Sequence, residues 1–381
     1  MKNKRLYYIP VVLVALLAMA YGCKDTDNSK MDFERIDSLC ARIFPENEPG
    51  GAVLILKGDD VVYCNCRGIA NADTGTRITD TTLFNIASVS KQFTAVGILQ
   101  LAEKNLLSLD DNVHKFFPEF SSNIWDRVQI KHLLSHSSGV PDGRGYLTRE
   151  QKVFGDEDLA TEYLKDLDAL HFEPGTAYEY MNPTFVVLGK IIEKVSGLPY
   201  VEYMEKNVLG PAGMSSSHFF DPELMAGLPE CSHGYVFIEG WKEYDYGEET
   251  FFATRPDGGL YTSVNDFVKW ELALRSGKVL GQEMLALAHT PHTQVSGSTW
   301  SDYQNRPNTW YGYGWFIEPK TEAGKETEAS PLVVYHTGDN GGYQILAARY
   351  PESDILVLIF ANQYNWDRYS AKMEIQDALG L

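Results

Sequence analysis

Residues 84–94 read FNIASVSKQFT, a run in which a serine and a lysine stand three positions apart at the start of a predicted helix. At that spacing Ser88 and Lys91 lie on one helical face, within reach of each other. A serine hydroxyl is a weak nucleophile until a base takes its proton, and a lysine in a dehydrated site can have its pKa lowered enough to help. The helix N-terminus also favours a developing oxyanion. The pair is a candidate reactive centre, although the same spacing occurs in many solvated helices.

A second element is Tyr180-Met181-Asn182, which comes just before a helix predicted over residues 183–196. A short loop at this point can present side chains to a binding site. A phenol close to Lys91 would be biased toward phenolate, so Tyr180 could serve as a general base. Asn182 also has a purely structural interpretation as the cap of the helix, with Pro183 in the first helical position.

A third element is His336-Thr337-Gly338, which ends a predicted strand and is followed by Asp339. A small residue such as Gly338 lets an extended substrate lie against an edge strand. The backbone amide of Asp339 could then join the amide of Ser88 in holding an oxyanion. The alternative interpretation is an ordinary glycine-rich hairpin.

The two ends of the chain predict the sheet. Predicted strands cover residues 51–57, 61–68, 332–336, 343–350 and 354–361, with helices at 31–43 and 366–379. Turn residues at 58–60 suit a hairpin between the first two strands. The sequence therefore predicts an α+β fold with one antiparallel sheet built from both termini, helices flanking it, and a mainly helical region inserted between them.

Between the two ends the pattern is mainly helical. Apolar side chains following Ser88 recur at helical spacing and predict one buried face. They are Ala95, Ile98, Leu99, Ala102 and Leu106. Another helix is predicted to begin after Ser263, which has the spacing of a capping box with Asp266. Residues 232–252 and 294–314 fit no regular pattern, and such segments either line binding sites or pack as surface loops.

Length and composition place the chain among compact globular proteins. It has 381 residues, of which 44% are hydrophobic, enough for a large core. The formal net charge of -19 disfavours a nucleic-acid partner, because binding phosphates requires clustered lysine and arginine.

The N-terminus predicts export. Lys2, Lys4 and Arg5 precede an apolar stretch that is short for a membrane span and ends at Cys23. Residues 1–22 resemble a bacterial lipoprotein signal peptide, with Cys23 as the lipidated residue. Residues 23–30 would be a tether, and 31–381 the folded domain. The mature protein would then be lipid-anchored and extracytoplasmic, on the periplasmic side or the cell surface. An uncleaved signal anchor with an incidental cysteine is the alternative.

Other possible ligands and cross-links carry little signal. The remaining cysteines show no metal-binding spacing, and burial as unreactive thiols is the usual interpretation, although Cys40 and Cys231 could form a disulfide. They are Cys40, Cys64, Cys66 and Cys231. His132 and His136 stand four apart, as zinc ligands on a helix can, but no third ligand stands nearby. We expect a scaffold role for both histidines, and no metal or cofactor.

The three chemical elements, in this order, resemble the motifs of the penicillin-recognising serine hydrolases, the superfamily of serine β-lactamases and D-Ala-D-Ala peptidases. Those motifs are S-x-x-K, a Tyr-x-Asn or Ser-x-Asn loop, and a Lys-Thr-Gly type triplet. Because Tyr180 opens the second motif, the class C β-lactamase branch is the most similar. Further stretches similar to that branch are residues 130–139, 172–175, 210–214 and 258–263. The resemblance extends from about residue 35 to the C-terminus.

Carried over position by position, the resemblance implies a complete site. The implied catalytic residues are Ser88, Lys91 and Tyr180, the implied substrate contacts are Asn182, His336, Thr337 and Gly338, and the implied oxyanion donors are the amides of Ser88 and Asp339. One departure is His336, which stands where β-lactamases usually carry lysine. A histidine with a pKa of about 6.5 is largely neutral at pH 7 and attracts a substrate carboxylate weakly. This favours ester or peptide substrates over efficient β-lactam hydrolysis.

We therefore expect a serine hydrolase that acts through an acyl-enzyme on an amide or ester. A β-lactam, a D-Ala peptide and a carboxylic ester all fit this site, because fold and catalytic set do not determine the substrate. The alternative is a non-catalytic sensor of the same fold that binds a β-lactam or cell-wall peptide.

Overall fold

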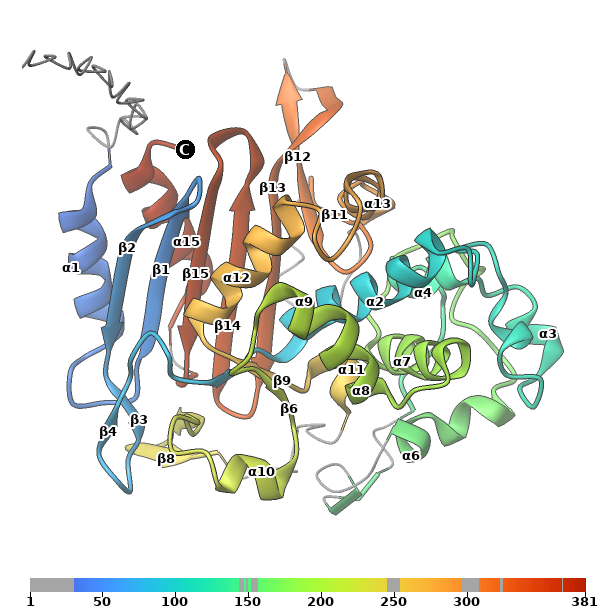
Figure 1. Ribbon diagram of the computed structural model, residues 1–381, viewed down its shortest axis with the longest axis horizontal. Coiled ribbons are helices and arrows are strands. Elements are labelled where there is room, and N and C mark those ends of the chain that lie inside the picture. Colours follow the sequence, from blue (N-terminus) through green and yellow to red (C-terminus); the bar gives the residue numbers. More distant parts are fainter. Residues whose placement is uncertain are drawn as a thin grey trace, which may run out of the picture.

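The computed structural model describes residues 31–143, 147–148, 150–151, 157–244, 254–295, 308–322, 325–364 and 366–381. The predicted signal peptide, Cys23 and the tether lie outside the described residues. A large antiparallel sheet with helices packed on it forms one half of the molecule, and a mainly helical region forms the other (Figure 1). The fold is α+β, as predicted.

The main sheet has eight strands in the order β10-β11-β12-β13-β14-β15-β1-β2. Their bounds are β1 Gly51–Lys57, β2 Asp60–Arg67, β10 Thr293–Gln294, β11 Trp310–Tyr311, β12 Phe316–Glu322, β13 Lys325–Asn340, β14 Tyr343–Tyr350 and β15 Ile355–Ala361. The first and last of the long strands are neighbours, because β1 pairs with β15 from Gly51↔Ala361 to Lys57↔Ile355. The prediction that both termini build one sheet is confirmed.

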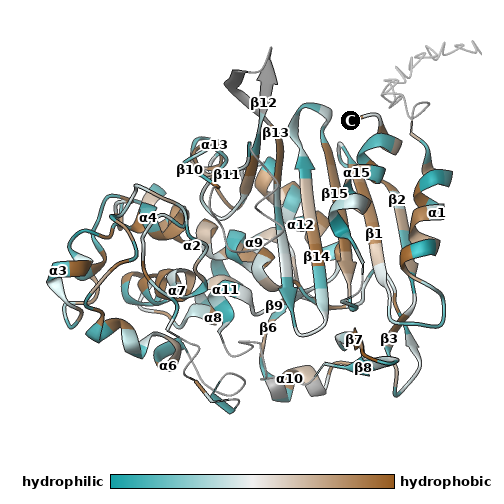
Figure 2. Ribbon diagram, turned by 180° about the vertical axis from the view of Figure 1, so that it is seen from behind, coloured by the Kyte–Doolittle hydropathy of each residue, from teal (hydrophilic) through white to brown (hydrophobic). Residues whose placement is uncertain are grey.

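Helices cover both faces of this sheet. On one face, α1 (Phe33–Ile43) and α15 (Arg368–Leu379) bury a cluster that includes Leu39, Val357 and Ile375. On the other face, α2 (Lys91–Glu103) and α12 (Val264–Arg275) bury a second, larger cluster with the central strands. The mainly hydrophobic colouring of β1 and β15 in Figure 2 reflects this burial on both faces.

Helix α2 is buried all round rather than on one face. Every residue from Lys91 to Leu101 is buried, because the helix runs between the sheet and the helical region (Figure 1). The predicted apolar face was therefore too narrow. It was also too long, because α2 ends at Glu103 and Leu106 is 56% exposed.

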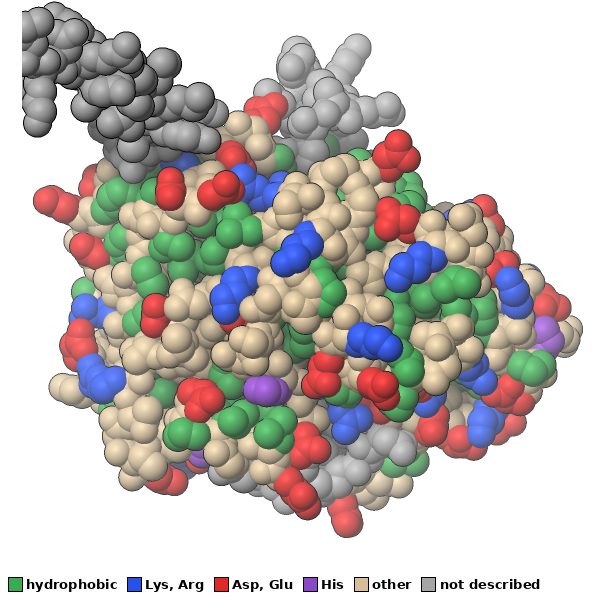
Figure 3. Space-filling view, in the orientation of Figure 1, with side chains coloured by type: hydrophobic (Ala, Val, Ile, Leu, Met, Phe, Trp, Pro, Cys, Tyr) green, Lys and Arg blue, Asp and Glu red, His purple; other side chains and the backbone are tan. Residues whose placement is uncertain are grey.

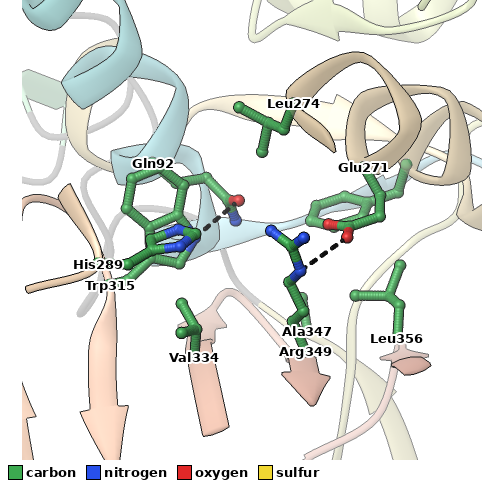
Figure 4. Close-up of a pocket in the computed structure, with 10 residues that line it drawn as sticks. Gln92, Glu271, Leu274, His289, Trp315, Val334, Ala347, Arg349 and Leu356 are labelled. Carbon is green, nitrogen blue, oxygen red and sulfur yellow. Dashed lines mark hydrogen bonds and ion pairs between the residues drawn. The ribbon is translucent and has the colours of Figure 1, made fainter. Parts of the chain in front are cut away.

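A small cavity of about 20 Å³ lies beside α2, against the sheet. Gln92 lines it, and its Oε1 accepts hydrogen bonds from the indole nitrogens of Trp270 (3.0 Å) and Trp315 (3.2 Å). Across the cavity, Arg349 Nε lies 3.1 Å from Glu271 Oε1 (Figure 4). This arrangement attaches the start of α2 to both α12 and the sheet.

The two predicted helix caps have different outcomes. Ser263 caps α12 as expected, accepting a hydrogen bond from the amide of Asp266. The prediction for Asn182 was wrong, because α7 (Asn182–Ser196) starts at this residue and its N-cap is Met181. The Asn182 side chain is thereby left available for another contact.

The remaining elements belong mostly to the helical region and its edges. The helices are α3 Ser122–Trp125, α4 Ile130–Leu134, α6 Glu157–Thr161, α8 Tyr200–Met204, α9 Gly210–Ala212, α10 Pro222–Ala226, α11 Arg255–Gly258 and α13 Gln282–Ala288. The short strands are β3 Ile69–Asn71, β4 Thr76–Arg77, β5 Phe84–Asn85, β6 His218–Phe219, β7 Tyr235–Phe237, β8 Trp241–Glu243 and β9 Leu260–Thr262.

The surface shown in Figure 3 has basic side chains interspersed with acidic ones rather than gathered into one area. Such a distribution gives no broad positive field for a polyanion. Within the described ranges, none of the helices is long and apolar enough to span a bilayer.

Candidate active site

Ser88 lies in a tight turn between β5 and α2. The turn is a short 3₁₀ helix, η1 (Ala87–Ser90), that continues directly into α2. Ala87 has a φ of 47°, and the side chain of Asn85 holds this conformation by accepting the Ala87 amide at 2.8 Å. Backbone in this region is costly for any residue with a Cβ, and such costs are concentrated at functional sites. Ser88 itself is partly exposed while its neighbours are buried.

Lys91 reaches back to Ser88 from the first residue of α2. Its side-chain nitrogen Nζ donates to Ser88 Oγ at 2.9 Å and to the backbone oxygen of Asp257 at 2.7 Å. The side chain is fully buried. The spacing of three therefore brings the amine onto the hydroxyl, and the carbonyl of α11 orients it from the other side.

The ring of Tyr180 also lies close to Lys91. Lys91 Nζ is 5.0 Å from the centroid of the Tyr180 ring and 5.7 Å from that of Phe185 on α7. A cation is attracted to an aromatic face at these distances. The predicted proton-handling pair is thus in contact, and the ring of the tyrosine lies beside the amine.

Asn182 presents an unmatched polar atom. Its Oδ1 is buried and has no hydrogen-bond partner among the described residues. Because buried polar groups are normally paired, such an atom calls for a ligand or another explanation. A substrate amide N–H is a donor of the kind that would satisfy it.

Gly338 brings strand β13 against the turn that carries Ser88. A Cβ at this position would lie 2.3 Å from the backbone oxygen of Ile86, so the close approach requires glycine. Arg368 of α15 binds the end of this strand, donating to the Gly338 oxygen (3.1 Å) and pairing with Asp339 (2.6 Å). The backbone of Thr337 and Asp339 is therefore held near Ser88, where the sequence predicted substrate and oxyanion contacts.

His336 has surroundings that differ from those expected of a substrate contact. The ring is fully buried, with Nε2 2.9 Å from the Tyr311 hydroxyl and Nδ1 2.6 Å from the Thr337 oxygen. This pairing makes Nδ1 the donor and Nε2 the acceptor of the neutral ring. Burial, and then the nearby Lys91, lower its pKa to about 3. Both nitrogens are occupied, so His336 offers no charge to a carboxylate.

Two site residues have roles that the sequence did not reveal. Tyr311 lies in residues 294–314, one of the two segments without a regular pattern, and its hydroxyl contacts His336. Lining a binding site was one of the two interpretations offered for that segment. His136 lies beyond the end of α4 rather than on a helix, and its Nδ1 accepts the amide of Met181 at 3.2 Å. His132 makes a separate contact, accepting the amide of Gln129 at 3.1 Å. The two histidines therefore serve different parts of the backbone.

The described residues contain no cluster of three or more side chains suited to hold a metal ion. Their four cysteines are free thiols, so the Cys40–Cys231 disulfide is absent. Burial raises the pKa of Cys40 to about 11 and of Cys231 to about 12, which makes both unreactive. Cys64 is exposed, contrary to the expectation of burial.

The sheet from both termini, the inserted helices and the Ser88–Lys91 pair together define the superfamily of serine β-lactamases and D-Ala-D-Ala peptidases. A family model described as "Beta-lactamase" matches residues 41–381, so the chain belongs to the β-lactamase family.

Named relatives agree with this assignment. Penicillin-binding protein 4* of Bacillus subtilis is 28% identical over 87% of this chain and 72% of its own length. Protein flp of Staphylococcus aureus is 25% identical over 82% of this chain, which spans only 59% of that protein. The solved structure of the octameric penicillin-binding protein homologue from Pyrococcus abyssi superposes with a TM-score of 0.76 and 30% identity, covering 92% of this chain and 78% of its own.

Proposed function

We propose that this protein is a serine hydrolase that transfers an acyl group to Ser88 and then to water. Ser88 Oγ attacks the carbonyl carbon of an ester or amide, and Lys91 with Tyr180 passes its proton to the leaving group. Water then attacks the acyl-enzyme, the same pair takes its proton and returns it to Ser88 Oγ, and the carboxylic acid leaves as the bond between the acyl carbon and Oγ breaks. The observation that carries the proposal is the hydrogen bond from the buried Lys91 to the partly exposed Ser88.

The backbone supports the remaining steps. The amides of Ser88 and Asp339 are proposed to hold the oxyanion, and Asn182 Oδ1 to accept an amide N–H of the substrate. Thr337 and Gly338 would line the extended part of the substrate, since glycine at 338 lets β13 approach the turn at Ile86. His336 is proposed to support this strand rather than to touch the substrate.

Charge at the site favours substrates without a carboxylate beside the scissile bond. His336 is neutral, and the guanidinium of Arg368 is already paired with Asp339. A carboxylate placed beside His336 would lose water without gaining a cationic partner from that residue. We infer that carboxylic esters or uncharged amides are better substrates than β-lactams or D-Ala-D-Ala peptides, although the relatives named penicillin-binding proteins point to the latter.

Labelling with a fluorophosphonate tests the proposal. The wild-type protein should gain one adduct on Ser88, detected by mass spectrometry of the intact protein and its peptides, and Ser88→Ala should gain none. Turnover of a p-nitrophenyl ester, a D-Ala-D-Ala peptide and a chromogenic cephalosporin should decrease in that order. An unlabelled, inactive wild-type protein that still binds a β-lactam would favour a non-catalytic sensor instead.

The anchor is a separate part of the proposal. We infer that Cys23 is lipidated and that the domain, which begins its first helix at Phe33, faces an extracytoplasmic compartment. Metabolic labelling with an alkyne fatty acid should mark the wild-type protein, and Cys23→Ala should remain unmarked. Equal labelling of both would contradict the anchor.

A further inference from the structure

His136 holds the backbone on both sides of Tyr180. Its backbone oxygen accepts the amide of Glu179 at 2.9 Å, and its ring Nδ1 accepts the amide of Met181 at 3.2 Å. A single residue, 45 positions away from Met181 in the chain, therefore binds the two amides that flank the phenol.

The imidazole ring also packs directly on the phenol. The ring centroids of His136 and Tyr180 are 4.2 Å apart, and Tyr311 and Phe185 enclose the imidazole at 4.7 and 5.2 Å. His136 has no exposed surface, so the contact cannot be exchanged for water. His136 therefore fixes the Tyr180 ring in two ways, by binding the backbone on both sides of the residue and by packing against the face of the ring.

This arrangement requires a neutral imidazole. Nδ1 can accept the Met181 amide only while it carries no proton. Burial, together with the neighbouring Lys91 and His336, holds the pKa of His136 well below its usual value. Protonation would place a hydrogen on Nδ1, so that two donors would face each other and the hydrogen bond from the Met181 amide would be lost.

The backbone of His136 is itself held in an unfavourable conformation, with a φ of 53°. Asparagine adopts this region more readily than most residues, and its Oδ1 occupies nearly the same place as histidine Nδ1. Asparagine can therefore keep the contact to Met181 without the rest of the ring.

We propose that His136 is a positioning residue that sets the Tyr180 hydroxyl for proton transfer with Lys91 during acylation of Ser88. The inference rests on the proposed function. His136 acts through the loop of residues 179–181 and through its packing on the Tyr180 ring.

Two substitutions of His136 by amide side chains of different length test this role. His136→Asn keeps an acceptor at the Nδ1 position, whereas His136→Gln moves the amide beyond it. The acylation rate constant is measured by stopped-flow release of p-nitrophenolate from p-nitrophenyl acetate, which has no amide for Asn182 to bind. We expect a decrease of about 10- to 100-fold for His136→Gln, since small misplacements have effects of this size. His136→Asn should stay within about fivefold of wild type.

His132→Gln is the matched control, because His132 also accepts a backbone amide through Nδ1 but contacts Gln129 rather than the Tyr180 loop. It should lower the melting temperature and leave the acylation rate constant within about twofold. A second readout is a double-mutant cycle. With Tyr180→Phe already in place, His136→Gln should cost less than about threefold, because the phenol through which it acts is gone.

The outcomes separate the two proposals. Equal acylation by His136→Gln, His136→Asn and wild type, or full additivity with Tyr180→Phe, would overturn the positioning role and leave the proposed function standing. A wild-type protein that is not acylated at all would overturn both.

Discussion

Lys91 and Gln92 are consecutive, fully buried side chains at the start of α2, yet they contact surroundings of opposite kinds. Lys91 engages a partly exposed hydroxyl, and in the same candidate site the Oδ1 of Asn182 has no hydrogen-bond partner among the described residues. Around Gln92, two indole donors share one acceptor, and Glu271 is matched by Arg349 (Figure 4).

The difference separates groups kept for stability from groups kept for chemistry. A buried polar group costs stability unless it is paired, so the matched set around Gln92 is what a supporting region requires. The incompletely matched set around Lys91 is tolerated where a ligand can complete it. One exception in the supporting region is His289, whose Nε2 has no partner among the described residues.

Separate substitution of Lys91 and Gln92 by methionine tests most directly whether one region serves catalysis and the other stability. Lys91→Met should lower the acylation rate constant by about a thousandfold, the size of a lost acid–base contribution. Its stability should change little, because a buried charge is exchanged for an apolar chain of similar volume. The measurements are burst kinetics and urea unfolding.

Gln92→Met should do the reverse. It leaves the indole N–H groups of Trp270 and Trp315 without their acceptor, at a cost of about 2–4 kcal/mol in the free energy of unfolding. Acylation by the folded protein should stay within about threefold of wild type. A loss of acylation as large as that of Lys91→Met would show that the two regions are not separate.

The Glu271–Arg349 pair sharpens the comparison. Burial raises the pKa of Glu271 although Arg349 and Arg275 oppose the shift, so the carboxylate of Glu271 is strongly desolvated. Glu271→Leu leaves a guanidinium without its partner and should lower the free energy of unfolding by about 3 kcal/mol. The double variant Glu271→Leu/Arg349→Met should recover most of that loss in urea unfolding. No recovery would mean that the charges are not coupled.

The smallest expected effect concerns acid stability. Burial, with Arg349 nearby, lowers the pKa of His289 to about 3. The unfolded chain takes up a proton below a pH of about 6.5 while the folded protein does not, so this stabilisation is complete above that pH and is lost toward pH 3.

His289→Gln removes this one contribution. Between pH 7 and pH 5, the variant should lose about 1–2 kcal/mol less of its free energy of unfolding than wild type does. Urea midpoints at the two pH values measure the difference. Parallel pH dependences would show that the imidazole is protonated in the folded protein as readily as in the unfolded one.

The sheet was predictable where its signals are local. β1 and β14 have the predicted bounds, because apolar runs between turn residues mark them. β12 was not predicted, and the register shifts on both sides of Pro319 show why its pattern is irregular. The narrow predicted face of α2 failed for another reason, since periodicity along one helix does not reveal how many sides are covered.

In the candidate site, too, some contacts follow from local sequence and others depend on the tertiary structure. The sequence by itself determined that Ser88 and Lys91 meet, because residues three apart on a helix are neighbours whatever surrounds them. Only the tertiary structure decided that the Asp257 carbonyl, 166 positions from Lys91, binds its amine, that His336 is neutral and enclosed, and that His136 binds the backbone beside Tyr180. Burial and partner choice depend on which distant surfaces pack together, and spacing along the chain does not contain that information.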